Sequence, residues 1–289
     1  MDFRNGKELL NICHTHSLRI SEVMKQRELT CGTLTEEEID SKLATILSIM
    51  KDAVHTPLDH PVRSMGGLIG GEAKKVNDFC QTEKNLCGSL LGKAITYSMA
   101  VLEVNASMGL IVAAPTAGSA GVLPGVLLAL QEEYNLTDAQ IYEAIVNASA
   151  IGYILMRNAS VSGAEAGCQA EVGAASAMAA SATVELMGGT PEMSLHAASL
   201  AISNLLGMVC DPIAGLVESP CQSRNSIGSA NAITAAQLAL ACVTHPIPFD
   251  EMVDAMYRVG KSIPFELRET AMGGCAGTPT GCALCGRCQ

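Results

Sequence analysis

Two cysteines, Cys210 and Cys221, enclose the segment of this chain whose residue types say most about chemistry. The residues between them include two prolines and a glycine, which do not fit a regular helix. We therefore predict a loop, which can fold back and direct both sulfur atoms at one point. Arg224 and Asn225 follow the second cysteine and add a cation and an amide. Thiolates beside such groups suit a metal site that binds a small anionic substrate.

Cysteine usage as a whole also favours metal or redox chemistry. The chain has 12 cysteines in 289 residues. Its first residues are charged and contain no apolar run, so they do not look like a secretory signal. Disulfides are uncommon in proteins that are not exported, so we expect a cytoplasmic protein whose thiols serve a metal or a redox role.

Two groups of cysteines are candidates for the metal ligands. Cys168, Cys210 and Cys221 each lie at a predicted helix boundary or in a glycine- and proline-bounded loop, where helix N-terminal amides can lower the pKa of a thiol. The C-terminal group ends in C-x-x-C-x-x-C, which matches three quarters of a ferredoxin-type run. Its alternative interpretation is a frayed end with exposed thiols. Spacing alone does not choose between the groups. The tail cysteines are Cys275, Cys282, Cys285 and Cys288.

The remaining thiols carry weaker signals. His14 and His16 stand beside Cys13 and are able to chelate a metal, but an exposed helix face explains them more simply. The other cysteines are predicted to be small buried hydrophobes. They include Cys13, Cys80, Cys87 and Cys242.

Charge and composition exclude some classes of partner. The formal net charge of −11 disfavours nucleic acids and anionic membrane surfaces, and 3% aromatic residues without tryptophan provide few stacking platforms. Residues 104–131 carry no charge and are long enough to cross a bilayer. Pro115, Pro124 and four glycines in this stretch would leave backbone groups unpaired in lipid, so we predict a buried loop between core helices instead.

Helical periodicity dominates the chain, and signals for strands are scarce. Thr35 and Thr137 precede amphipathic stretches as N-caps, and Thr190 precedes a proline at a helix start. Residues 172–184 are apolar or small on every side, as in a helix enclosed by others. We predict an all-α multi-helix bundle with buried central helices and Gly/Pro-rich active-site loops. It forms one catalytic domain over residues 1–289, with a cysteine-rich tail at 275–289.

Four motifs resemble those of a known family. They lie at residues 64–67, 114–118, 164–173 and 210–221, in the order expected for the iron–sulfur L-serine dehydratases. The similarity is greatest to the separate α subunit of the two-chain bacterial form, and it covers nearly the whole chain. The tail departs from the pattern, because members of the family commonly end after the stretch matched here by residues 273–281.

The resemblance implies a function and a cofactor. It implies a lyase of amino-acid degradation and gluconeogenesis that converts L-serine to pyruvate and ammonia. Cys168, Cys210 and Cys221 fall on the family's three ligands of a 4Fe–4S cluster. Three cysteines leave one iron open to act as a Lewis acid. The resemblance also implies a separate β subunit and an oligomer, and we predict that this chain alone is weakly active or inactive.

Other residues are predicted to support the reaction. Glu165 and Glu171 flank Cys168 and are expected to act as supporting groups, and the sequence does not identify the base that removes the Cα proton. Cys288 is a candidate ligand in the resting state or at a second site. Candidates for contact with the substrate are Ser64, Gly66, Gly67, Thr116, Gly118, Ser119, Arg224 and Asn225.

Three alternatives stay open at this point. An L-cysteine desulfidase would use the same cluster with sulfide as the leaving group. A pyridoxal-phosphate enzyme would need a Schiff-base lysine, for which Lys93 is the one tempting candidate. A metal-binding sensor without catalytic activity would use the tail cysteines.

Overall fold

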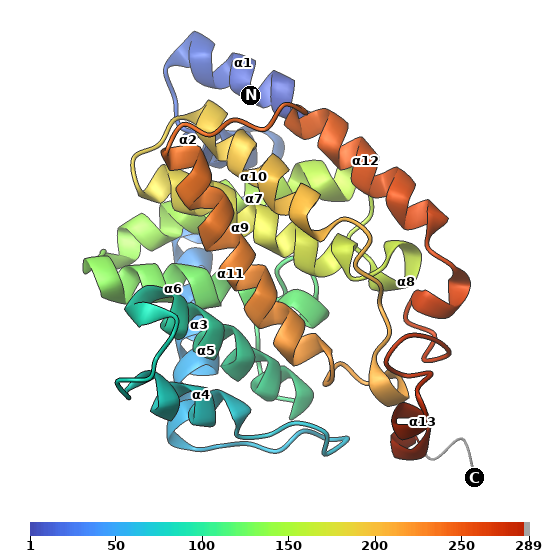
Figure 1. Ribbon diagram of the computed structural model, residues 1–289. Coiled ribbons are helices and arrows are strands. Elements are labelled where there is room, and N and C mark those ends of the chain that lie inside the picture. The colour runs from blue at the N-terminus through green and yellow to red at the C-terminus, as the bar shows by residue number, and fades with distance from the viewer. Residues whose placement is uncertain (286–289) are drawn as a thin grey trace.

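The computed structural model describes residues 1–285, and this part of the chain consists of helices joined by loops (Figure 1). No β-strand occurs among the described residues, and one isolated bridge joins Cys210 to Arg268. The prediction of an all-α bundle is confirmed. The α-helices are α1 (Gly6–His16), α2 (Ile20–Cys31), α3 (Glu36–Asp59), α4 (Glu72–Cys80), α5 (Gly88–Ala106), α6 (Val122–Tyr134), α7 (Asp138–Asn158), α8 (Gly163–Ala166), α9 (Ala174–Leu186), α10 (Pro191–Leu205), α11 (Cys221–Leu240), α12 (Phe249–Ser262) and α13 (Pro279–Cys285).

Polar caps begin three of these helices as predicted. Thr35 accepts a hydrogen bond from the backbone amide of Glu38, whose side chain accepts one from the amide of Thr35, at the start of α3. Thr137 and Gln140 form the same arrangement at α7, and Thr190 caps α10. The first N–H groups of a helix have no partner within the helix, so these side chains fix where each helix starts.

Helix α9 occupies the centre of the bundle. Every residue from Ala174 to Glu185 is buried, and α6, α7, α10 and α11 pack around it (Figure 1). Alanine and serine dominate its sequence, so neighbouring backbones approach closely. Ser176, for example, donates a hydrogen bond of 2.9 Å to the carbonyl of Gly228 on α11. The prediction of a buried central helix in this region is confirmed.

Two helices begin at cysteines or just after them. A π-helical turn, η2 (Gln169–Gly173), leads into α9, and Cys168 is the residue before that turn. Helix α11 begins at Cys221. Pro220 is the last proline of the loop, and a proline is tolerated at the edge of a helix because the first N–H groups lack partners in any case.

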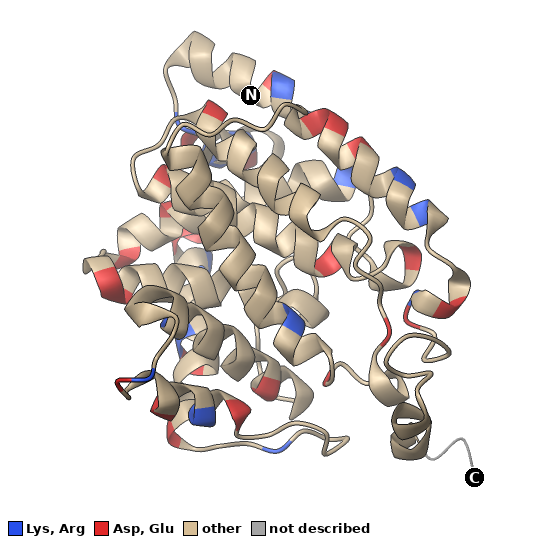
Figure 2. Ribbon diagram, viewed as in Figure 1, with Lys and Arg blue, Asp and Glu red and all other residues tan. Residues whose placement is uncertain are grey.

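Charged side chains lie mostly on the outer helices, whereas α9 and α11 carry few (Figure 2). The uncharged stretch at residues 104–131 forms the end of α5, a loop with the short turn η1 (Ala117–Ser119), and α6. The loop is not buried throughout as predicted, since Met108 and Leu110 are 80% and 71% exposed. Within the described part of the chain, no helix has the length and apolar character needed to cross a membrane.

Candidate metal centre

The structure brings two of the three predicted ligands into contact. The sulfur atoms of Cys168 and Cys210 and a carboxylate oxygen of Glu171 all lie within 4.8 Å of one another. Both cysteines are buried, and Glu171 is half-buried. Cys221 is also buried, at the first position of α11. Because Cys168 and Cys210 come from distant segments of the chain, this contact is a product of the tertiary fold.

Backbone contacts hold the two segments together. Gly167 has φ +75°, and a Cβ atom there would lie 2.7 Å from the carbonyl of Met208. The amide of Gln169 donates to that same carbonyl, and its side chain accepts from Gly207. A side chain at position 167 would push the segment before Gln169 away from Met208 and weaken the hydrogen bonds that hold Cys168 close to Cys210.

A second set of backbone contacts fixes Cys210 itself. Its amide donates to Leu267 at 2.8 Å, and its carbonyl accepts from Glu269 at 2.6 Å. The segment after α12 therefore lies beside the metal centre. This explains why the only isolated bridge of the described residues involves Cys210.

Glu171 places its carboxylate between the thiols. One oxygen accepts a hydrogen bond of 2.6 Å from the hydroxyl of Thr116, and the other lies 4.0 Å from the sulfur of Cys168 and 3.9 Å from that of Cys210. Burial raises the pKa of Glu171, the Thr116 hydroxyl opposes this rise, and the charge of Glu269 adds to it. The expectation of a supporting group beside Cys168 therefore has a structural basis at Glu171, whereas Glu165 accepts from Ser160 instead.

The thiol pKa values differ from the prediction. Contact with Cys168 and burial raise the pKa of Cys210, and burial with the nearby charges of Cys168 and Glu171 raises that of Cys221. The expected lowering by helix amides is wrong for these two residues, because the contact with Cys168 and burial disfavour the thiolate of Cys210, and burial disfavours that of Cys221. A bound metal cation is the kind of partner that would reverse this balance.

Arg224 lies beside the centre but is already paired. Its guanidinium forms an ion pair of 2.6 Å with Asp211 and donates to the carbonyl of Val209. Burial would lower the pKa of Arg224, but the negative charge at Cys168 and the bond to Asp211 raise it. This cation therefore offsets negative charge next to the thiols.

Asp211 also joins the C-terminal region to the loop between Cys210 and Cys221, called the metal loop below. Its second oxygen accepts from the backbone amide of Cys275 at 2.6 Å. Burial would raise the pKa of Asp211, but the amide of Cys275 and the guanidinium of Arg224 hold it below its ordinary value. The beginning of the tail is thus bound to the centre and is not a frayed end. Cys288 lies outside the described residues.

Asn225 spans two loops of the centre. Its side-chain oxygen accepts from the amide of Gly121, and its nitrogen donates to the carbonyls of Gly118 and Cys221. The residue is fully buried. Its hydrogen-bonding groups are used to hold the η1 loop against α11, so the structure gives it a positioning role.

The predicted substrate residues of the first loop are likewise engaged within the protein. Ser64 donates its hydroxyl to Glu218 at 2.7 Å, and the amide of Gly66 donates to the same carboxylate at 2.6 Å. The amide of Gly67 donates to Ser64. Glu218 lies inside the Cys210–Cys221 loop, so this contact joins the Ser64–Gly67 motif to the metal loop.

Sequence reasoning missed two carboxylates of this region. Glu171 was expected to support the centre, but Asp211 and Glu218 were not proposed for any role. Both are nevertheless within a few residues of a predicted ligand cysteine. The sequence feature that could have identified them is an acidic residue that stands among uncharged residues close to a candidate ligand cysteine.

The other cysteines and Lys93 lie elsewhere. Cys13 is buried as predicted, and Cys80 is half-buried. Cys87 and Cys242 are exposed, so the prediction of buried hydrophobes is wrong for those two. They sit in short surface turns that do not enclose them. Lys93 pairs with Glu132 at 3.1 Å, so its ammonium group is held in an ion pair.

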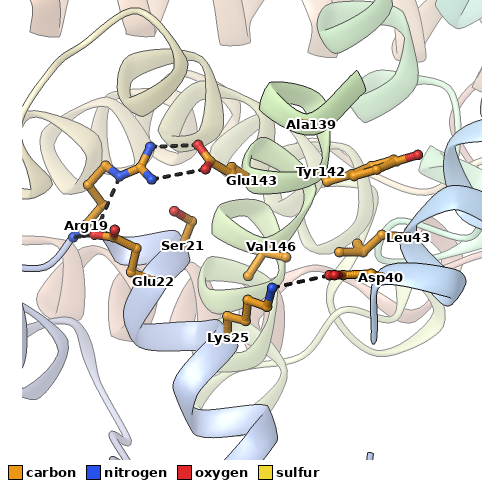
Figure 3. Close-up of a pocket in the computed structure, with 10 residues that line it drawn as sticks. All are labelled: Arg19, Ser21, Glu22, Lys25, Asp40, Leu43, Ala139, Tyr142, Glu143 and Val146. Carbon is orange, nitrogen blue, oxygen red and sulfur yellow. Dashed lines mark hydrogen bonds and ion pairs between the residues drawn. The ribbon is translucent and has the colours of Figure 1, made fainter. Parts of the chain in front are cut away.

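A separate hollow of about 440 Å³ lies between α2, α3 and α7 (Figure 3). Arg19 forms a two-bond contact with Glu143 at its upper edge, and Lys25 pairs with Asp40 at its lower edge. It contains no cysteine. Its charged groups are already paired with one another, and the metal centre is formed by other elements.

The chain matches the family model described as serine dehydratase alpha chain over residues 15–276. The chain belongs to this family. The matched region includes Cys168, Cys210 and Cys221, whereas Cys282 and Cys285 lie beyond its end.

Similar proteins agree with this assignment. A Bacillus subtilis protein named probable L-serine dehydratase, alpha chain, is 49% identical over 96% of this chain and 93% of its own length. The L-serine dehydratase, alpha chain, of Peptoniphilus asaccharolyticus is 44% identical over 96% and 94%. The Escherichia coli L-serine dehydratase TdcG is 34% identical, and the match covers 95% of this chain but 62% of that protein.

Proposed function

We propose that this chain is the catalytic α chain of an L-serine dehydratase, a lyase that converts L-serine to pyruvate and ammonia. The observation that carries the proposal is the contact of Cys168 with Cys210 beside Glu171, with Cys221 buried nearby. This arrangement occurs in a chain whose relatives of similar length are named as L-serine dehydratase alpha chains.

The residues of this centre fit a 4Fe–4S cluster held by Cys168, Cys210 and Cys221. The three thiols are buried, free of disulfides and carried by separate segments. Burial disfavours the unligated thiolates of Cys210 and Cys221, and metal coordination deprotonates such thiols. When bound, a cluster on three cysteines would supply one open iron as a Lewis acid for the hydroxyl of the substrate.

The chain's own residues then shape the surroundings of that position. Glu171 holds the Thr116 hydroxyl next to the thiols, and Asn225 holds the same loop at Gly118. We propose that this loop, with Ser119, forms the wall beside the substrate. Arg224 supplies positive charge near Cys168, which favours the carboxylate of the amino acid.

We also propose a protein partner. The names of the two most similar relatives quoted above specify an alpha chain, and the Escherichia coli relative has more than a third of its length without a counterpart in this chain. A separate β chain would supply such a region here. We place the complex in the cytoplasm, where reduced thiols and iron–sulfur clusters persist.

The proposal is tested with anaerobically purified chain carrying Cys221→Ser, beside Cys242→Ser as a matched control at an exposed thiol. We expect Cys221→Ser to lose both cluster-bound iron and pyruvate release from L-serine, because the metal loses a ligand, and Cys242→Ser to keep both. Iron and sulfide analysis and a pyruvate assay measure the outcome.

Each assay is run with and without the β chain, and with L-cysteine in place of L-serine. Little turnover by the chain alone and full turnover with the partner would support the two-chain assignment. Faster pyruvate release from L-cysteine would favour the desulfidase. Full iron content and turnover in Cys221→Ser would contradict the proposed centre.

A further inference from the structure

The carboxylate of Glu218 is held by a nest of hydrogen-bond donors on another loop. Glu218 is 2% exposed and lies within the loop that joins Cys210 to Cys221. One of its oxygens accepts from the amide of Gly66 at 2.6 Å. The other accepts from the hydroxyl of Ser64 at 2.7 Å and the amide of Leu68 at 2.9 Å. The three donors belong to one short loop, so a single side chain determines how that loop lies.

The loop that carries these donors, the Ser64–Ile69 loop, is organised around this carboxylate. The hydroxyl of Ser64 donates to Glu218 and also accepts from the amides of Gly67 and Ile69, at 3.1 and 3.3 Å. A Cβ atom at Gly66 would lie 2.7 Å from a Glu218 oxygen, so the close approach requires glycine. No cation pairs with Glu218 in the described part of the chain. Neutral donors alone therefore satisfy the buried Glu218 carboxylate, so the loss of any one of them would leave a buried oxygen with fewer hydrogen bonds.

The backbone of Glu218 belongs to the metal loop. Its carbonyl accepts from the amide of Gln222, in the first turn of α11, at 2.9 Å. The ligand Cys221 stands one residue before Gln222. Across the base of the loop, the amide of Ile213 donates to the carbonyl of Ser219. A metal that fixes Cys210 and Cys221 would consequently fix the position of the Glu218 carboxylate as well.

We propose that Glu218 couples metal binding at Cys210 and Cys221 to the ordering of the Ser64–Ile69 loop. The coupling rests on the metal centre of the proposed function. Ser64, Gly66 and Gly67 are the predicted substrate contacts of this loop, and Glu218 is the positioning residue that places them. Coupling of this kind is reciprocal, so order in the loop also favours retention of the metal.

The test compares hydrogen–deuterium exchange at the amides of Gly66 and Leu68 in the apo chain and in the chain loaded with cluster. In the unaltered chain we expect loading to slow exchange about tenfold. Glu218→Gln should abolish this difference. A glutamine NH₂ group would face an N–H donor in either orientation of the amide, at Gly66 or at Leu68.

Two further variants make the result specific. Glu266→Gln, at an exposed acid, is the matched control and should keep the tenfold effect. Ser64→Ala removes the hydroxyl that donates to Glu218 and accepts from the amides of Gly67 and Ile69, and it should reduce the effect if Glu218→Gln fails to fold. In samples of equal iron content, we also expect Glu218→Gln to raise KM for L-serine by a factor about ten times larger than the factor by which it lowers kcat. The reason is that the loop is misplaced while the metal is retained.

A Zn²⁺-loaded sample separates this proposal from the proposed function, since Zn²⁺ also binds thiolates. If the chain takes up no iron and shows no lyase activity, the dehydratase proposal is overturned. If Zn²⁺ still slows exchange at the Gly66 and Leu68 amides in that case, the coupling is supported. Loading that slows exchange equally in the unaltered chain and in Glu218→Gln would overturn the coupling, as would loading that slows it in neither.

Discussion

At the scale of single residues, the metal centre depends on glycines that leave room for Glu171. A Cβ atom at Gly163 would lie 2.4 Å from a Glu171 oxygen and 3.0 Å from the sulfur of Cys210. A Cβ atom at Gly118 would lie 2.8 Å from the other Glu171 oxygen. The carboxylate is therefore confined on both sides, and small changes in these positions move it against the thiols.

The substitution Gly163→Ala tests this confinement. We expect a loss of about 1–3 kcal/mol of unfolding free energy from overpacking, together with a marked fall in iron content after anaerobic reconstitution. Denaturant unfolding and iron analysis measure the two effects. Gly173→Ala is the matched control, because its nearest contact would be an ordinary 3.7 Å. Equal behaviour of the two variants would show that the space beside Glu171 is not limiting.

At the scale of elements, the centre is formed where loops and helix ends converge. Cys168 precedes the π-turn before α9, Cys221 begins α11, and Thr116 precedes the η1 turn. Asn225, one turn into α11, binds the backbone of Gly118 and Gly121 near η1 and that of Cys221 at the start of its own helix. The geometry of the thiols therefore depends on hydrogen bonds between elements as well as on each element alone.

The substitution Asn225→Ala should separate the η1 loop from α11. It leaves the amide of Gly121 and the carbonyl of Gly118 without their partner in a buried site, so we expect a loss of about 1–3 kcal/mol of unfolding free energy. Thermal unfolding of the metal-free chain measures this loss. Asn11→Ala, at an exposed position of α1, should change stability by less than about 0.5 kcal/mol. A comparable loss in both variants would argue against the bridging role.

At the scale of the whole molecule, the helical core encloses a further buried acid. Glu103 on α5 is fully buried, and one oxygen accepts from the amide of Ala73 and the side chain of Gln222. Its other oxygen has no hydrogen-bond partner among the described residues. Burial raises the pKa of Glu103, although the amide donors oppose the rise.

The raised pKa gives a sign to the pH dependence of stability. A carboxyl whose folded pKa lies above its unfolded value stabilises the fold fully below the unfolded pKa, and this contribution is lost as pH rises through the folded pKa. The glutamine of Glu103→Gln does not ionise, so this variant does not lose that stability as the pH rises. Its melting temperature relative to the unaltered chain should therefore be higher at about pH 8 than at about pH 5. Glu83→Gln, at an exposed acid, should show no such trend, and an equal difference at both pH values for Glu103→Gln would contradict the assignment.

The helices themselves were largely predictable from the sequence. Thr35, Thr137 and Thr190 mark helix starts through local hydrogen bonds, and the small residues of α9 mark a helix enclosed on all sides. Both signals act over a few residues, so they can be read without knowing the fold. The three candidate cysteines were chosen over the tail cysteines through resemblance to a family, because their spacing carries no geometric information by itself.

Only the tertiary structure decided which groups meet. It placed Glu171 against Cys168 and Cys210, paired Arg224 with Asp211, and directed the Ser64 loop at Glu218. It also raised the thiol pKa values that helix ends alone would have lowered. Desolvation and hydrogen bonding between distant segments depend on how the chain packs, and no local pattern of residues encodes them.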